Sequence, residues 1–165
     1  KDVKAMINFS SLTGVNSSLL NAVESINNEQ LLSIMVIIKK KLGSIKGKTI
    51  TILGLAFKPD TDDVRDSVSI KLIGLLLKKG AKIKAHDPKA LSNTKPIFKN
   101  KIEYQEHIVE SLRNSDCVII MTSWNGYSKI DNSMLKTMKK PIIIDTRRIL
   151  VGKELDMDYS ATGIG

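Results

Sequence analysis

Cysteine is nearly absent from this 165-residue sequence, and the single one excludes an intrachain disulfide or a site with several cysteine ligands. Cys117 lies in the apolar run Asp116–Met121, which predicts a buried strand and an unreactive thiol rather than a catalytic one. The two histidines, His86 and His107, are far apart and have no ligand partners at metal spacing. We therefore predict no metal site. Aromatic residues make up only 4% of the chain, so the core must rest on Ile, Leu, Val and Met.

Long uncharged apolar runs are also missing. No stretch of about 18 such residues occurs, so we predict no membrane-spanning segment. The chain begins at Lys1 rather than Met and shows no signal-peptide pattern. We expect a piece of a longer, cytoplasmic protein, with enough residues for one core and an extra helix.

Arginine is scarce in a sequence whose net charge is +9, because only four of its 26 basic residues are arginine: Arg65, Arg113, Arg147 and Arg148. A basic protein suggests partners that are nucleic acids or phosphorylated small molecules. The lysines are spread along the chain and do not alternate with aromatic residues, which favours a solvated surface over nucleic-acid binding. Because arginine has a fixed fork for phosphate or carboxylate, Arg65 and Arg147 are the more informative cations.

The first 45 residues have a helical pattern. Asn16, Ser17 and Ser18 can cap a helix of about 25 residues that ends in the cationic turn Lys39–Lys41 and at Gly43. The helix is apolar on more than one face and needs cover on more than one side. A second subunit or a missing domain would supply that cover, and we favour a homodimer through this helix.

From residue 48 the pattern changes to strands alternating with helices. Strands are predicted at 49–54, 81–87, 117–122 and, as the last one, 141–145; helices are predicted at 67–79, at 108–114 and over Met134, Leu135 and Met138 after a cap at Asp131. This alternation predicts an α/β fold, a Rossmann-like three-layer parallel sheet with helices on both faces, preceded by the long helix. We divide the chain into a helical connector or dimerisation segment, 1–45, and a ligand-binding domain, 46–165.

The carboxyl ends of the predicted strands carry the residue types of a ligand site. They are Ala56–Lys58, Asp87, Ser123–Trp124 and Thr146–Arg147. Ligands of such sheets bind beyond these ends. This convergence is the main physical indication of a site.

The loop from Gly54 to Ser67 does not follow the dinucleotide pattern Gly-x-Gly-x-x-Gly, because Ala56 and Pro59 occupy glycine positions. We therefore reject an NAD site in this domain, although Asp87 imitates a ribose-binding acid. The loop instead offers side-chain ligands for phosphate or sugar. An equally weighted alternative is a structural loop whose acids favour the start of the next helix.

Several motifs together resemble one family. They are the run GLAFKPDTDDVRDS at residues 54–67, Ala85–Pro88, Thr122–Trp124 followed by Tyr127, Ile144–Arg148, Tyr159 with Gly163–Gly165, and Lys1–Asp2. They are similar to the signature of the UDP-glucose/GDP-mannose dehydrogenase family, and the resemblance covers essentially the whole chain.

The resemblance implies that Phe57, Lys58 and Arg147 contact a nucleotide-sugar substrate. Arg65 would reach NAD, and Asp2 would lie near the catalytic nucleophile. In the family, two hydride transfers to two NAD oxidise the sugar alcohol through cysteine-linked intermediates.

This sequence departs from the family pattern in important places. The family's nucleophilic cysteine and NAD-binding domain would precede Lys1, so the chain alone should be inactive and NAD should be bound mainly outside it. Ser123 and Thr146 replace residues common in the family. The Thr-x-Trp run favours UDP-glucose, with UDP-N-acetylmannosamine dehydrogenase or a non-catalytic nucleotide-sugar-binding module as alternatives.

Overall fold

The computed structural model describes residues 2–162, without the side chains of Asp2, Lys4, Asn27 and Asn28. Its elements are α1 (Asp2–Thr13), α2 (Ser18–Leu42), β1 (Thr49–Leu53), α3 (Val68–Lys78), β2 (Lys82–His86), α4 (Leu91–Phe98), η1 (Lys99–Lys101), β3 (Glu103–Gln105), α5 (Ile108–Leu112), β4 (Cys117–Ile120), η2 (Asn125–Lys129), α6 (Asn132–Leu135), β5 (Ile142–Asp145) and β6 (Asp158–Ala161).

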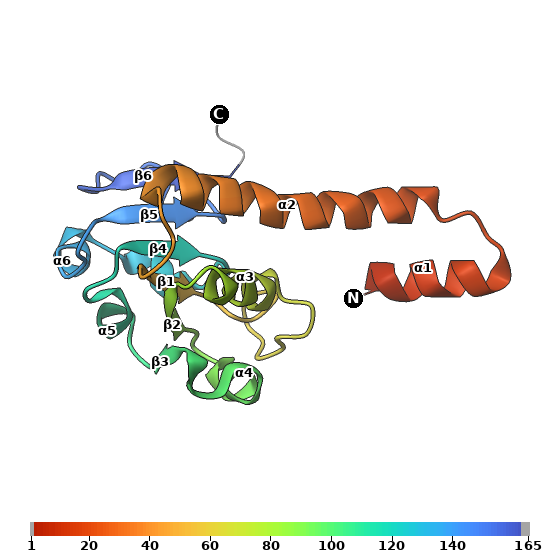
Figure 1. Cartoon of the computed structure of the whole chain (residues 1–165), viewed down its shortest axis with the longest axis horizontal. Helices are drawn as coiled ribbons and strands as arrows, with labels where there is room; N and C mark the ends of the chain where they lie inside the picture. Colours follow the sequence, from red (N-terminus) through yellow and green to blue (C-terminus); the bar gives the residue numbers. More distant parts are fainter. Residues whose placement is uncertain (1, 163–165) are drawn as a thin grey trace.

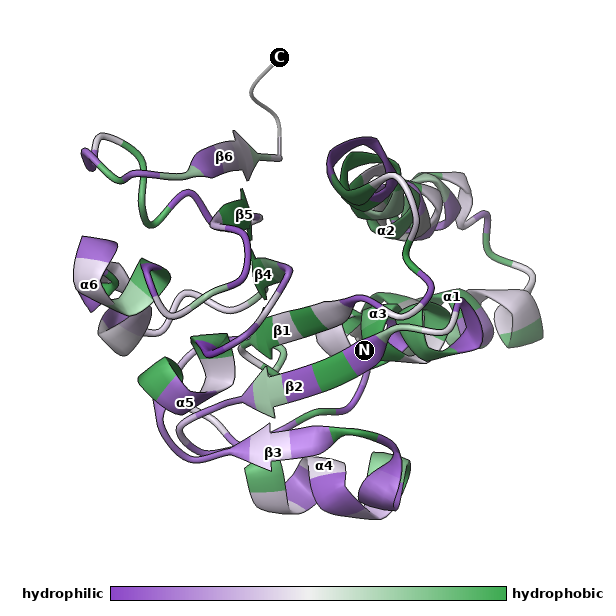
Figure 2. Cartoon of the chain, turned by 60° about the vertical axis from the view of Figure 1, so that its left-hand side comes forward, coloured by the Kyte–Doolittle hydropathy of each residue, from purple (hydrophilic) through white to green (hydrophobic). Residues whose placement is uncertain are grey.

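The strands form one sheet in the order β3-β2-β1-β4-β5-β6, and every neighbouring pair is parallel. Helices α2 and α3 cover one face, and α5 and α6 cover the other (Figures 1 and 2). The predicted three-layer parallel fold is confirmed.

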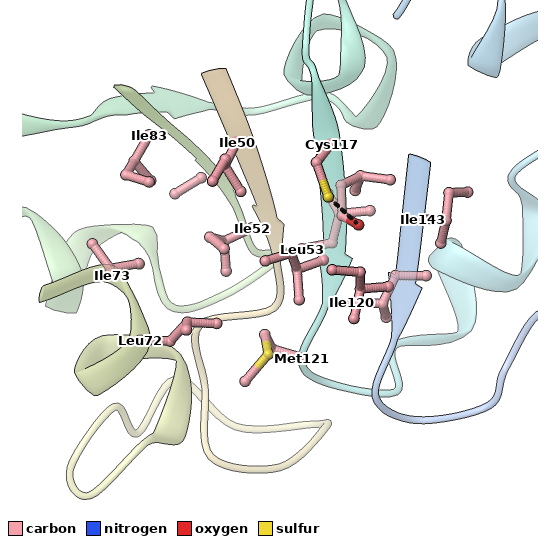
Figure 3. Close-up of a cluster of buried hydrophobic side chains, with 14 of the residues drawn as sticks. Ile50, Ile52, Leu53, Leu72, Ile73, Ile83, Cys117, Ile120, Met121 and Ile143 are labelled. Atoms are coloured by element: carbon pink, nitrogen blue, oxygen red, sulfur yellow. Dashed lines mark hydrogen bonds between the residues drawn. The ribbon is translucent and has the colours of Figure 1, made fainter. Parts of the chain in front are cut away.

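The core lies between these layers and is almost entirely aliphatic. The central strands β1, β4 and β5 bury nearly every side chain, as expected for a parallel sheet covered on both faces. Figure 3 shows how Ile50 and Ile52 of β1 lie near Leu72 and Ile73 of α3. Such a continuous apolar interior fixes the strands, and thereby the positions of the loops that follow them.

Helix α2 spans 25 residues and confirms the predicted long helix. Asn16 Oδ1 accepts from Ser18 N at 2.8 Å, and Gly43 N donates to Lys39 O at 2.9 Å at the other end. Ile34 and Ile38 are buried against the sheet. The amino-terminal half of α2 extends beyond the sheet, and α1 folds back alongside that half of the helix (Figure 1). The division of the chain at residue 45 remains a prediction.

Two strands and one α-helix were not predicted from the sequence, nor were the short 3-10 helices η1 and η2. The strand at residues 141–145 is not the last one, because β6 follows it and pairs with it. Strand β3 and helix α4 were missed as well, since β3 has only three residues and α4 contains Pro96. The helix after Asp131 is shorter than predicted and ends at Leu135, before Met138, although Asp131 does accept from Met134 N at 3.0 Å as its cap.

Helix α2 is also the longest helix among the described residues. Neither it nor any other helix within residues 2–162 combines the length and apolar character that crossing a membrane requires.

Candidate functional site

The carboxyl ends of the parallel strands place several loops along one edge of the sheet. Lys58 follows β1 and Arg147 follows β5, and both strands flank β4. Lys58 and Arg147 therefore lie at the same edge, as the sequence predicted. A parallel sheet of this kind binds ligands at this edge.

The loop after β1 begins with a close approach to the end of β4. Gly54 has φ +96, and a Cβ at this position would lie 2.5 Å from Thr122 Cβ. Thr122 Oγ1 donates to Ala56 O at 2.7 Å, which fastens the two loops together. Glycine is thus required here by both its backbone conformation and the contact.

Asp87 is a structural centre of this edge. Its buried carboxylate accepts five N–H groups: Leu55 N at 2.7 Å, Ala56 N at 3.1 Å, Trp124 Nε1 at 3.1 Å, Lys89 N at 2.9 Å and Ala90 N at 2.8 Å. These donors come from the loops after β1, β2 and β4. Asp87 therefore ties three loops together, which agrees with the rejection of a ribose-binding role. Trp124 is held by the same carboxylate and is buried as well.

Arg147 lines a cavity of about 470 Å³ between α2 and the sheet edge. The other walls include Gln30 and Ser33 of α2, Val68 at the start of α3, and Thr146 and Arg148. The backbone N–H of Arg147 donates to Asp145 Oδ1 at 3.0 Å, and its Nε donates to Met121 O at 2.6 Å. These bonds fix the base of the side chain and orient its fork.

The charge of Arg147 has no carboxylate partner among the described residues, unlike that of Arg65. Partial burial lowers the pKa of Arg147 from the ordinary arginine value, although the side chain still reaches solvent. A guanidinium that lines a cavity and has no carboxylate partner among the described residues is favourable for an anion, because its remaining donors fit phosphate or carboxylate oxygens.

Phe57 and Lys58 lie on the same loop but do not line that cavity. Phe57 is 46% exposed, and Lys58 Nζ lies 5.4 Å from the centroid of its ring. A flat aromatic face and an ammonium group are available here at the surface. The structure thus brings these two residues together with each other, at the edge that also holds Arg147.

Arg65 lines a separate cavity of about 460 Å³ with Asp62, Asp63 and Asn93. Its Nε and Nη2 donate to both carboxylate oxygens of Asp63, with Nη2 at 2.6 Å from Oδ2. The hydrogen bond and charge of Asp63 raise the pKa of Arg65. The Arg65 fork is therefore occupied within its own loop.

Asp2 is the first residue of α1, and its side chain lies outside the described part of the structure. The motif residues Lys1 and Gly163–Gly165 lie outside it too.

The thiol of Cys117 is buried in β4, and burial raises its pKa to about 12, as the predicted unreactive thiol requires. His86 is buried with its Nδ1 3.0 Å from Tyr127 OH, which donates to His86 O at 3.0 Å. Burial lowers the pKa of His86. Both groups have structural roles, and within residues 2–162 no cluster of His, Cys, Asp or Glu could hold a metal ion.

Sequence reasoning did not identify the α2 side of the Arg147 cavity. Gln30 and Ser33 are polar residues three positions apart at the edge of the apolar stretch of α2. That spacing places both on one helix face and was the available signal. Thr162, after β6, was missed because β6 itself was missed.

Residues 51–152 match the family described as UDP-glucose/GDP-mannose dehydrogenase family, UDP binding domain. The UDP-glucose 6-dehydrogenase TuaD of Bacillus subtilis is 33% identical over 156 residues, which are 94% of this chain and 34% of that protein. The UDP-glucose 6-dehydrogenase AglM of Haloferax volcanii is 34% identical over 161 residues, which are 98% of this chain and 36% of that protein. The chain thus spans about a third of the length of these curated relatives.

Solved structures show the same similarity. A UDP-glucose dehydrogenase from the hyperthermophilic archaeon Pyrobaculum islandicum superposes with a TM-score of 0.83 at 30% identity, covering 96% of this chain and 35% of that one.

Proposed function

Because the chain belongs to the UDP-glucose/GDP-mannose dehydrogenase family, we propose that it is the nucleotide-sugar-binding part of an NAD-dependent UDP-glucose 6-dehydrogenase. The whole protein would oxidise UDP-glucose to UDP-glucuronate in two hydride transfers. The names of the relatives at 33% and 34% identity support this substrate. The observation that carries the proposal is Arg147, a cation that has no carboxylate partner among the described residues and lines a cavity at the ligand edge of the sheet.

Three side chains would divide the recognition of the substrate. Arg147 presents a fork to the phosphate oxygens, and its base is already fixed by Met121 O and Asp145. Lys58 adds a point charge that can follow the ligand, since it is exposed. Phe57 offers an exposed ring face for stacking.

NAD would supply the hydride acceptor when bound, mainly by protein outside residues 1–165. The described residues fit only a minor share of that task, because the loop after β1 lacks the glycine pattern and Arg65 is the one cation among the described residues that line the cavity beside Asp62 and Asp63. In the whole protein, the Arg65 guanidinium would give up its hydrogen bonds to Asp63 and bind a polar group of NAD instead. Its exposed position, 68% of the side chain, makes that exchange possible.

The chain alone is proposed to be inactive. Its single cysteine lies in a core strand with a pKa of about 12, so no described group can act as the family's thiolate nucleophile. Asp2 is proposed to lie near that nucleophile in the whole protein.

Two alternatives remain for the ligand and the activity: a UDP-N-acetylmannosamine dehydrogenase, or a non-catalytic nucleotide-sugar-binding module. The run Thr122–Trp124 favours the UDP-glucose enzyme. The coding sequence upstream of Lys1 separates an enzyme from a module: Cys-Phe-Pro directly before Lys1 and a Gly-x-Gly-x-x-Gly start support the enzyme, and their absence contradicts it.

Calorimetry with a panel of nucleotide sugars tests the proposed ligand. We expect heat with UDP-glucose and UDP, and at least about tenfold weaker binding of GDP-mannose, because a site whose hydrogen bonds match uracil leaves polar groups unpaired when guanine takes its place. Tighter binding of UDP-N-acetylmannosamine than of UDP-glucose would favour the alternative sugar. No heat and no thermal shift with millimolar UDP ligands would contradict a preformed site.

We further propose a homodimer through the α1–α2 hairpin. The hairpin exposes large apolar side chains well beyond the sheet: Met6, Phe9, Leu12, Val15 and Leu19, with 57–85% of each accessible. A patch of this kind favours burial against another protein surface. Sedimentation should give twice the 18.2 kDa chain mass, and Leu19→Glu should shift it toward the monomer. Val151→Glu, a matched change at an exposed apolar residue outside the hairpin, should leave the dimer intact. A monomeric wild type at high concentration would contradict the dimer.

A further inference from the structure

Arg148 has an unusual backbone conformation for its residue type. Its φ is +57, in the left-handed region that residues with a Cβ rarely adopt and that glycine adopts without steric strain. The residue directly follows the turn at Thr146 and Arg147, which comes after β5 at the ligand edge of the sheet. Glycine would fit this conformation better, so an arginine here carries a cost in stability. Residues held in such conformations cluster at functional sites.

The side chains of Arg147 and Arg148 belong to one cavity although the two residues are neighbours in the chain. In an extended chain, consecutive side chains point in opposite directions. After β5, however, both arginines line the cavity of about 470 Å³. No aspartate or glutamate is among the described residues that line it. The turn and the left-handed residue after it therefore place two cations, and no described acid, around the same space.

Both guanidinium groups are anchored in the same way, through Nε. Arg148 Nε donates to Thr162 O at 3.1 Å, and Arg147 Nε donates to Met121 O at 2.6 Å. Among residues 2–162, neither arginine forms an ion pair with a carboxylate, and the Nη groups of neither donate to a protein acceptor. Thr162 lines the cavity as well. The bond to Thr162 O thus holds the base of the Arg148 fork beside the cavity and leaves its terminal donors for a ligand.

A purely structural role for Arg148 would rest on Asp145, the acid at the end of β5. The buried Asp145 carboxylate accepts from Arg147 N at 3.0 Å, Leu150 N at 2.9 Å and Tyr159 OH at 3.1 Å, and none of these bonds involves Arg148. Burial and Asp145 raise the pKa of Tyr159 to about 12, and the charge of Arg148 opposes that rise. The contact between Arg148 and this group is therefore one of charge alone.

We propose that Arg148 binds the diphosphate group of the nucleotide sugar together with Arg147. This inference rests on the proposed function and adds Arg148 as a binding residue. Two anchored guanidinium groups at one cavity fit two linked phosphates, because each fork matches phosphate oxygens and the pair balances more than one negative charge. The left-handed backbone of Arg148 is the conformation that brings the second guanidinium to the cavity, which accounts for an arginine at a position suited to glycine.

The test compares the wild-type chain with Arg148→Gly and with the control Lys99→Gly. Lys99 is also an exposed cation with a left-handed backbone, at φ +51, but it begins η1 and does not line the cavity. Both variants remove one positive charge and place glycine at a position that suits it. Both should therefore keep or raise the melting temperature.

Calorimetry with UDP, inorganic pyrophosphate and uridine then measures binding. We expect Arg148→Gly to weaken UDP and pyrophosphate about tenfold or more, the effect of hydrogen bonds to a charged group, and to leave uridine unchanged. Lys99→Gly should match the wild type with every probe.

The outcomes separate this inference from the proposed function. Equal UDP affinity of the wild type and Arg148→Gly overturns the role of Arg148 and leaves the proposed function standing. Equal weakening in Arg148→Gly and Lys99→Gly also overturns it, because the effect is then one of net charge. A lower melting temperature of Arg148→Gly with unchanged affinities assigns the residue to the fold alone.

Two outcomes concern the ligand itself. A wild type that binds pyrophosphate through Arg148 but does not bind UDP retains the two-arginine site and contradicts the proposed function. A wild type that binds neither UDP nor pyrophosphate overturns both proposals.

Discussion

Replacing Asp87 by asparagine tests the account of how the ligand edge is held together. The two carboxylate oxygens accept five N–H groups at 2.7–3.1 Å, and the residue is 2% exposed. Asparagine has one oxygen, so its NH₂ group must face at least two of these N–H donors. Two lost hydrogen bonds to a charged group, at roughly 1.5–3 kcal/mol each, give a destabilisation of about 3–6 kcal/mol.

A loss of this size is a large part of the stability of a single domain, which is about 5–15 kcal/mol. The assay is urea unfolding followed by circular dichroism, with Asp156→Asn as the matched control. Asp156 is exposed, so its replacement should change the free energy of unfolding by less than about 0.5 kcal/mol. Equal unfolding midpoints for Asp87→Asn and Asp156→Asn would refute the structural role of Asp87.

Three further predictions concern Gly54, Cys117 and His86. Gly54→Ala should lower stability by about 3 kcal/mol or more in urea unfolding, because its Cβ would lie 2.5 Å from Thr122 Cβ at a φ of +96; a loss below about 1 kcal/mol would contradict the contact. Cys117 should react with a thiol reagent at pH 8 roughly 100-fold or more slowly than in urea, since burial raises its pKa to about 12, and equal rates would contradict the buried thiol. The lowered pKa of His86 means that the unfolded state binds its proton first as the pH falls. Stability should therefore be complete above about pH 6.5 and decline below it, and His86→Gln should flatten this decline in urea midpoints measured from pH 7.5 to pH 5.

The central strands could be predicted from the sequence because a strand that is buried on both faces consists almost entirely of apolar residues. The run Cys117 to Ile120 is apolar on both faces, and Ile50 to Leu53 is interrupted only by Thr51, which is the pattern expected of a parallel strand covered on both sides. Strands β3 and β6 lack this apolar pattern, since each includes exposed polar positions and β3 is three residues long. Edge strands are defined by backbone pairing with a neighbour, which a local pattern does not contain.

The residues of the candidate site, too, could be predicted from the sequence only in part. The location of Arg147 could be predicted because this rare arginine stands two residues after a buried strand, and chain order places it at the ligand edge; its contact with substrate, which the resemblance implies, stays a prediction. The contribution of α2 depends on how that helix packs on the sheet, so Gln30 acquires meaning only in three dimensions.

Binding of UDP to the wild-type chain and to Arg147→Ala tests the central claim most directly. The control is Arg113→Ala, an exposed arginine in the turn between α5 and β4, at the amino-terminal edge of the sheet. Loss of a charge-assisted fork should weaken UDP at least about tenfold in Arg147→Ala and leave Arg113→Ala like the wild type. Equal UDP affinity of all three proteins, measured by calorimetry with the fold verified by circular dichroism, would contradict the assignment of this edge as a nucleotide-sugar site.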